Sequence, residues 1–270
     1  MTVGNAAFQL VDERGWRRGL NNLLQAEFSS WFKSRKWWVH VLIWLFSINL
    51  ILFFTIIGAK DAAKAGEPAG DDTVQLYSIF GGMFVLIGVI VVAQGAIIGD
   101  KKSGTAAWIL SKPVSRTAFV VSKLIGNGVG LLLTAVLVPG LVAYFEFYWA
   151  LEGWLPLLNF VAAVATLGLH MFFWLSLTIM LGAFFDSWGP IIGIPLAFAF
   201  GQNTIIGFAP FLVYVFPWAL AVPAGDEYPS LAWSFVNGEA PFSWVPLIAA
   251  VVFSVLFVGL AVWRFGREEF

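Results

Sequence analysis

The sequence contains no cysteine and little charge. Only 11% of its 270 residues are Asp, Glu, Lys or Arg, whereas about one quarter is usual in soluble domains. The absence of cysteine excludes disulfides, thiolate metal sites and cysteine nucleophiles. Hydrophobic residues make up 60% of the chain, and the mean hydropathy is +0.85. We therefore expect an integral membrane protein with the lipid bilayer as a partner, and we expect no nucleic acid as a partner.

Catalytic and metal-binding residues are also scarce. The two histidines, His40 and His170, fall at different depths of the apolar runs, so they do not form a pair that could ligate a haem. Neither histidine has a serine at a spacing typical of a catalytic pair. The dipeptide Gly-Lys never occurs, which excludes a phosphate-binding loop of the Gly-x-x-x-x-Gly-Lys type. The sequence thus predicts no catalytic residue, no metal site and no cofactor bound by this chain.

Long apolar runs are abundant instead. A transmembrane helix needs about 20 mostly apolar residues. We predict an all-α polytopic membrane protein in which residues 1–270 form one transmembrane domain. Six spans are expected, at 38–58, 77–98, 118–144, 157–185, 190–218 and 244–263. The first twenty residues lack the apolar stretch of a cleavable signal peptide, so the first span is expected to direct its own insertion.

The distribution of the 15 Lys and Arg residues predicts the orientation. All of them except Lys60 and Lys64 lie before the first span, around the loop between the second and third spans, or after the last span. Because cytoplasmic loops carry an excess of Lys and Arg, both termini are expected in the cytoplasm of a plasma (inner) membrane. Residues 219–243 then lie outside. They are too polar to span, yet they contain enough aromatic residues to dip into the outer leaflet.

An amphipathic helix is predicted over 20–37. Its apolar face collects Leu20, Leu23, Leu24, Phe28, Trp31 and Phe32, and its polar face collects Asn22, Gln25, Ser29, Lys33 and Lys36. Such a helix lies in the membrane plane with its cations near anionic headgroups.

The segment GDKKSGTAAWILSKPVSR, Gly99 to Arg116, interrupts the apolar sequence between the second and third spans. Ser103 or Thr105 can cap a short helix over 106–110, and Pro113 ends it. Ser115 can cap the third span, and Lys123 in its first turns can extend back to the aqueous boundary. The charges alone favour an ordinary cytoplasmic loop that follows the positive-inside rule.

The order of residues in this loop is more informative than its charge. GDKKSGTAAWILSKPVSRTAFVVSKLIG resembles the loop between spans two and three of the type-2 ATP-binding-cassette (ABC) transporter permeases. The family usually has Glu where Asp100 stands. QAEFSSWFKSRKWW is similar to the family's helix before span one, with Glu27 at the recurrent Glu and Lys33 and Arg35 among the basic residues. The resemblance covers about residues 20–130, and beyond them it rests on topology. The matching loop positions are Asp100, Lys101, Lys102, Ser103, Gly104, Thr105, Leu110, Pro113, Val114, Ser115, Arg116 and Lys123.

This resemblance implies the membrane subunit of an ATP-driven transporter, most simply an exporter. In the family, two permease subunits, identical or paralogous, pair with two separate ABC ATPase subunits, which bind ATP and Mg. The loop at 100–116 would form the coupling helix that docks on the ATPase. Trp108, Ile109 and Leu110 could supply its apolar anchors, and Lys101, Lys102, Lys112 and Arg116 could form a charged rim. The resemblance also implies that residues 219–243 form short re-entrant helices.

Gln202, Asn203 and Thr204 interrupt the fifth span, where polar groups are costly unless they are paired. They could face a substrate pathway or a dimer interface, or they could form a locally bonded kink. A second function also stays open, namely an ATP-independent secondary transporter or channel. Such proteins often carry broken helices in matched halves, and we find no internal repeat here. The sequence does not identify the transported substrate.

Overall fold

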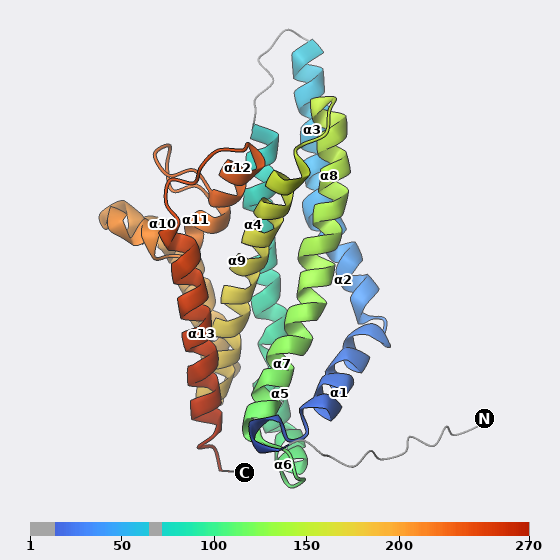
Figure 1. The fold of residues 1–270 in the computed structure, drawn as a ribbon, viewed down its shortest axis with the longest axis vertical. Coiled ribbons are helices and arrows are strands. Elements are labelled where there is room, and N and C mark those ends of the chain that lie inside the picture. The colour runs from blue at the N-terminus through green and yellow to red at the C-terminus, as the bar shows by residue number, and fades with distance from the viewer. Residues whose placement is uncertain (1–13, 65–71, 270) are drawn as a thin grey trace, which may run out of the picture.

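A computed structural model describes residues 14–64 and 72–269, and in these ranges every regular element is a helix (Figure 1). The two ends of the expected 1–270 domain lie outside the described residues. In chain order the elements are η1 (Gly15–Arg17), α1 (Leu20–Phe32), α2 (Lys36–Trp44), η2 (Leu45–Asn49), α3 (Leu50–Lys64), α4 (Asp72–Ala93), α5 (Gly95–Lys102), α6 (Thr105–Leu110), α7 (Arg116–Leu131), η3 (Leu132–Leu137), α8 (Val138–Leu151), α9 (Leu157–Phe184), α10 (Trp188–Phe208), η4 (Pro210–Tyr214), α11 (Trp218–Ala221), α12 (Leu231–Val236) and α13 (Val245–Phe265).

The described residues contain six helices that are long and apolar enough to cross a membrane, which confirms the predicted all-α architecture with six spans. They cover Lys36–Lys64, Thr73–Lys102, Arg116–Leu151, Leu157–Phe184, Trp188–Phe208 and Val245–Phe265. The first and third include the π-helical turns η2 and η3. The fifth helix ends at Phe208 rather than near residue 218. Pro210 and Pro217 follow it, and proline lacks the N–H that would continue the helical hydrogen bonds.

Helix α9 is the most buried of the six and forms the centre of the fold. It packs against α13, α4 and α12, and its fully buried Trp174 contacts Phe173 and Phe198. In Figure 1, α3 and α8 run side by side and extend beyond the upper end of α13. Helix α6 and the C-terminal end of α13 lie together at the opposite end of the bundle. The two ends of the molecule are therefore built from different elements.

Helix α1 packs against α7 rather than standing apart from the bundle. Two glycines make this close approach possible. A Cβ atom at Gly126 would lie 2.6 Å from the Cβ of Glu27, and one at Gly130 would overlap the buried ring of Trp31. The helix ends at Phe32, short of the expected residue 37. Ser34 follows this end, and its hydroxyl bonds to the Ser30 carbonyl at 2.7 Å, a local bond that competes with helix continuation.

We predict that Gly130→Ala lowers stability through this contact. The added methyl group overlaps the Trp31 ring, so we expect a loss of about 1–3 kcal/mol of unfolding free energy, the usual range for overpacking. Gly259→Ala is the matched control, because it gains the same helix propensity in α13 with open space around the new methyl group. Thermal unfolding of both variants in detergent measures the difference. Equal melting temperatures would contradict the tight packing of α1 on α7.

Candidate functional site

The loop between the second and third spans is built on a sharp turn after α5. Gly104 has a φ of 74°, in the left-handed region that glycine adopts without strain. On either side of it, the hydroxyl groups of Ser103 and Thr105 lie 2.8 Å apart in a hydrogen bond. The Ser103 hydroxyl also accepts a bond from the Thr105 backbone N–H at 3.4 Å. Gly104 is therefore the N-cap of α6, and the prediction that the side chain of Ser103 or Thr105 caps this helix is wrong.

Helix α6 places one large apolar side chain on the surface. Trp108 is 64% exposed, and the Lys112 ammonium lies 4.3 Å from the centre of its ring. Ala106 is fully buried beneath the helix, and Leu110 is partly buried against the hydrophobic core. The three suggested anchors therefore have different surroundings, because Ile109 and Leu110 pack against the core whereas Trp108 is exposed. Of the three, Trp108 presents the largest free surface to another molecule.

Ser115 joins the end of this loop to the N-terminal segment. Its hydroxyl accepts a hydrogen bond from the Ala118 N–H at 2.9 Å, so it caps α7 as predicted. The same hydroxyl donates to the Trp16 carbonyl, and the Ser115 N–H donates to the Arg18 carbonyl at 2.9 Å. Trp16 in η1 and Arg18 directly after it are thereby held against the start of α7.

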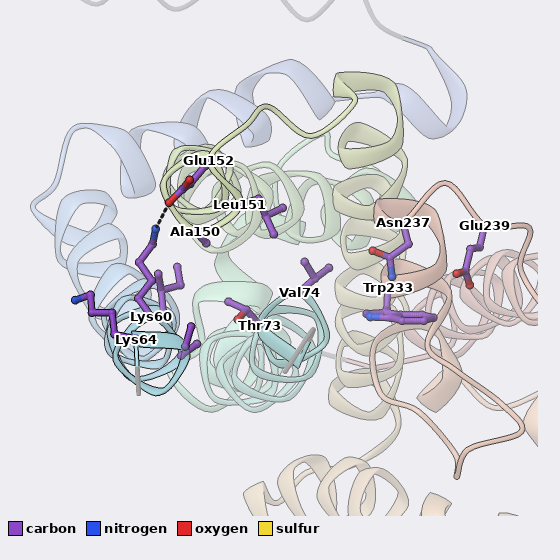
Figure 2. Close-up of a pocket in the computed structure, with 13 residues that line it drawn as sticks. Lys60, Lys64, Thr73, Val74, Ala150, Leu151, Glu152, Trp233, Asn237 and Glu239 are labelled. Atoms are coloured by element: carbon purple, nitrogen blue, oxygen red, sulfur yellow. Dashed lines mark hydrogen bonds and ion pairs between the residues drawn. The ribbon is translucent and has the colours of Figure 1, made fainter. Parts of the chain in front are cut away.

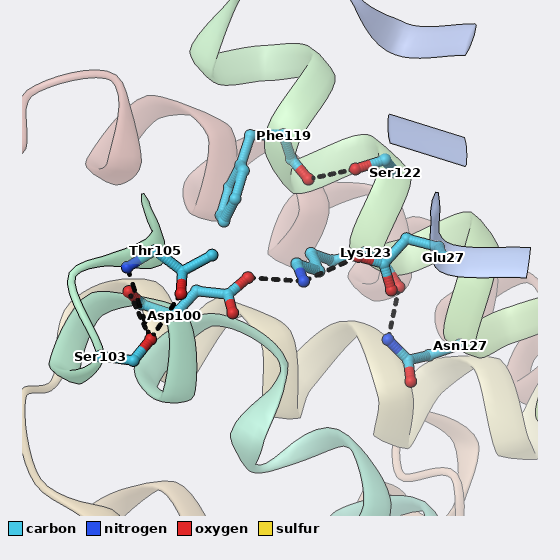
Figure 3. Close-up of polar contacts among 8 residues, drawn as sticks. All are labelled: Glu27, Asp100, Ser103, Thr105, Phe119, Ser122, Lys123 and Asn127. Carbon is cyan, nitrogen blue, oxygen red and sulfur yellow. Dashed lines mark hydrogen bonds and ion pairs between the residues drawn. The ribbon is translucent and has the colours of Figure 1, made fainter. Parts of the chain in front are cut away.

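A first ion-pair cluster connects α1, α5 and α7 (Figure 3). The Lys123 ammonium lies 2.7 Å from a carboxylate oxygen of Glu27 and 2.6 Å from one of Asp100. All three side chains are mostly buried, with exposed fractions of 14%, 18% and 23% for Lys123, Glu27 and Asp100. The prediction that Lys123 extends to the aqueous boundary is therefore wrong. Two nearby carboxylates provide an internal partner, and the ammonium group stays between them.

A second cluster connects α5 with the α9–α10 link and with the end of α13. Lys101 lies 2.6 Å from Asp186 and 2.8 Å from Glu268, and Glu268 also pairs with Arg264 at 2.5 Å. Arg116, at the start of α7, donates to the backbone carbonyls of Gly266 and Glu268 at 2.9 and 2.6 Å. The Lys101 ammonium, hydrogen-bonded to Asp186, lowers the pKa of that carboxyl below its ordinary value. Both clusters meet at the last turn of α5.

The remaining cations of the expected site lie outside these clusters. Lys102 lies 5.8 Å from the ring centre of Trp188, and Lys33 and Arg35 are exposed where α1 turns into α2. The structure thus brings Glu27 together with the loop but leaves Lys33 and Arg35 on the surface. Asp186 and Glu268 are cluster members that sequence reasoning missed, since neither belongs to a local motif.

The polar residues of α10 have different surroundings. Gln202 is fully buried, and its side-chain oxygen accepts a bond from the Trp218 N–H at 3.2 Å. Asn203 and Thr204 are exposed, and the end of α10 points away from the rest of the bundle in Figure 1. For Gln202, the interpretation as a locally hydrogen-bonded residue therefore applies. Of the three, only Asn203 and Thr204 remain available to face a pathway or a second subunit.

Each ring nitrogen of His170 has a hydrogen-bond partner. The Trp174 indole N–H donates to Nε2 at 3.1 Å, so Nδ1 carries the proton and donates to the Pro217 carbonyl at 3.1 Å. His170 and Gln202 together hold the Pro217–Trp218 turn against α9 and α10. Among the described residues, no three His, Asp or Glu side chains are grouped so as to hold a metal ion.

The sequence profile described as ABC-2 family transporter protein matches residues 21–270. The chain belongs to the ABC-2 transporter family. No curated protein sequence matches it. Membership in this family and the six apolar helices make the chain a multi-pass membrane protein, a transporter permease. The matched range includes both ion-pair clusters and α6, so the loop described above is part of an ABC-2 transporter.

Proposed function

We propose that this chain is the permease subunit of an ATP-driven exporter, which works as a dimer together with a separate ABC ATPase. The observation that carries the proposal is the exposed side chain of Trp108 on α6. Helix α6 follows α5, and the two ion-pair clusters both include a residue in the last turn of α5. Through Asp100 and Lys101, these clusters join α5, the helix that precedes α6, to α1, α7, the α9–α10 link and the end of α13. A force applied at α6 would therefore reach α1, α7 and α13 rather than being absorbed locally.

The proposal assigns the other tasks as follows. The end of the bundle that carries α6 faces the cytoplasm of the plasma membrane, with both chain termini on that side. ATP and Mg bind to the partner ATPase, so this chain has no catalytic role. Asn203 and Thr204, with two exposed aromatic residues of α10, Phe200 and Phe208, supply a surface for a second permease subunit or for the pathway.

Co-expression with an ABC ATPase encoded beside the permease gene tests this proposal. We expect a stable complex whose ATP hydrolysis is vanadate-sensitive, and transport in proteoliposomes that requires both subunits. The competing function is an ATP-independent secondary transporter or channel. Transport by the purified permease alone, driven by an ion gradient, would establish that function and overturn ours.

A further inference from the structure

Three cations lie close together where α1 turns into α2, and we call Lys33, Arg35 and Lys36 the basic turn. All three are exposed, and none of their side chains forms an ion pair or a hydrogen bond with another described residue. Three peptide links separate Lys33 from Lys36, so their Cα atoms lie within about 11 Å of each other. The Ser34 hydroxyl accepts a hydrogen bond from the Lys36 N–H at 3.2 Å, which fixes the turn from within.

The acidic residues near the basic turn have other partners. Glu27 is the only acidic residue between positions 14 and 60, and it is mostly buried beside Lys123. Helix α1 packs on α7, and α2 packs on η3 and α8. Among these three elements the only acidic residue is Glu146, which accepts a hydrogen bond from Asn49 at 2.9 Å. The positive charge of the basic turn is therefore uncompensated.

The lysines at the other end of the bundle are paired. Figure 2 shows Lys60 and Lys64 at a cavity of about 800 Å³, away from α6. Lys60 lies 3.4 Å from Glu152, and Lys64 lies 2.9 Å from Asp61. Because each of them has a carboxylate at hand, they serve as a comparison for the two lysines of the basic turn.

Helix α1 has two apolar stripes with different surroundings. Leu23 and Trp31 pack in the hydrophobic core, on the side of the helix that faces α7. The outer stripe consists of Leu24, Phe28 and Phe32. Each of its members follows a residue of the α7-facing side by one position, which turns it about 100° around the helix. Within the described part of the chain, the outer stripe does not join the hydrophobic core, and the rings of Phe28 and Phe32 lie 6.4 Å apart.

Aromatic side chains flank the basic turn. Phe32 precedes it, Trp37 and Trp38 follow it, and their exposed fractions are 37%, 43% and 42%. Tryptophan is enriched where a membrane meets water, because its ring is apolar and its N–H is polar. An apolar stripe beside cations and tryptophans is typical of a helix that lies among lipid headgroups. The basic turn is then at the level of the lipid phosphates.

We propose that the basic turn binds the anionic phospholipid headgroups of the leaflet in which α1 lies, and that this binding holds α1 against α7. Cations without a protein partner favour an anionic headgroup, and the outer stripe favours a lipid over a soluble phosphate. Glu27 of α1 and Asp100 of α5 share Lys123, so a lipid that holds α1 in place also stabilises the last turn of α5. Binding to the isolated chain does not depend on the exporter function.

Direct binding of radiolabelled phosphatidylglycerol to the purified, delipidated chain in dodecyl maltoside tests the first step. The unlabelled competitors are phosphatidylglycerol, phosphatidylcholine, which has no net charge, and glycerol 3-phosphate, which lacks the acyl chains. We expect phosphatidylglycerol to compete at least about tenfold better than the other two compounds. Equal competition by phosphatidylcholine would exclude recognition of charge. Equal competition by glycerol 3-phosphate would exclude a lipid as the ligand.

Matched lysine variants assign the binding to the basic turn. We expect the double variant Lys33→Gln, Lys36→Gln to weaken phosphatidylglycerol binding by about 20-fold, since each cation near an anionic surface contributes about fivefold. The double variant Lys60→Gln, Lys64→Gln removes the same charge from paired lysines and should keep wild-type affinity. None of the four lysines is buried, so both variants should fold. Equal losses in the two variants would reduce the effect to overall charge and overturn the proposal.

Hydrogen exchange tests the link from α1 to α5. We expect phosphatidylglycerol to slow exchange of the backbone amides of residues 95–110 by at least about threefold in the wild type. Glu27→Gln keeps the basic turn and should bind the lipid normally, but it lacks the charge that pairs with Lys123 and should show no such slowing. Equal slowing in Glu27→Gln, or none in the wild type, would exclude the link. Neither measurement involves the ATPase, so failure of ATPase assembly would overturn only the exporter function.

Discussion

Trp108→Ala is expected to weaken the complex with the ABC ATPase by at least about tenfold, and to lower ATP-driven transport with it. A large aromatic side chain that fills a pocket of a partner typically dominates the binding free energy. Because Trp108 is 64% exposed in the free chain, its removal leaves the permease fold intact. Co-purification of the two subunits and vanadate-sensitive transport in proteoliposomes measure the effect. The melting temperature of the permease alone should not change.

Trp263→Ala is a matched control for this experiment. Trp263 is 49% exposed, and Arg267 lies 4.4 Å from its ring centre, which is close to the geometry of Trp108 and Lys112. Its variant should assemble and transport normally. Leu110→Ala is unsuitable as a test, because Leu110 packs on the core and its truncation destabilises the loop itself. Normal assembly and transport by Trp108→Ala would show that α6 does not dock on the ATPase.

Lys123→Met is expected to be the most destabilising single change in the loop region. It leaves the carboxylates of Glu27 and Asp100 mostly buried and without their shared cation. Removal of one partner from a buried ion pair costs about 3–5 kcal/mol. We expect a corresponding fall in the unfolding free energy, measured by chemical denaturation in detergent. Exposed Lys102→Met is the control and should leave stability unchanged.

The triple variant Glu27→Gln, Asp100→Asn, Lys123→Met distinguishes lost charge compensation from lost packing. It removes both unpaired carboxylates, so it should recover most of the stability that Lys123→Met loses. Recovery would show that the penalty comes from uncompensated charge. A triple variant as unstable as the single variant would mean that the Lys123 side chain acts through its packing.

The sequence predicted the spans well, because the free energy of removing apolar side chains from water is a local property of each run. The cap at Ser115 was also predictable, since its partner Ala118 is three residues away. The ion-pair clusters were not predictable. Lys123 is separated from Glu27 by the whole of the first two spans, and Asp186 and Glu268 reach Lys101 only after α9 and α13 pack. The end of α10 at Phe208 was not predictable, because the sequence does not show which of its several prolines interrupts the helix.

Asp100 and Lys101 are neighbours in the last turn of α5, yet each belongs to a different ion-pair cluster. Successive residues of an α-helix point about 100° apart, so the two side chains hold this end of α5 from two directions. Rotation of α5 about its own axis would break at least one cluster. Displacement of α5 along its axis, together with α1, α7, the α9–α10 link and the end of α13, would preserve both. The two clusters therefore favour a displacement of α5 along its axis over a rotation about that axis.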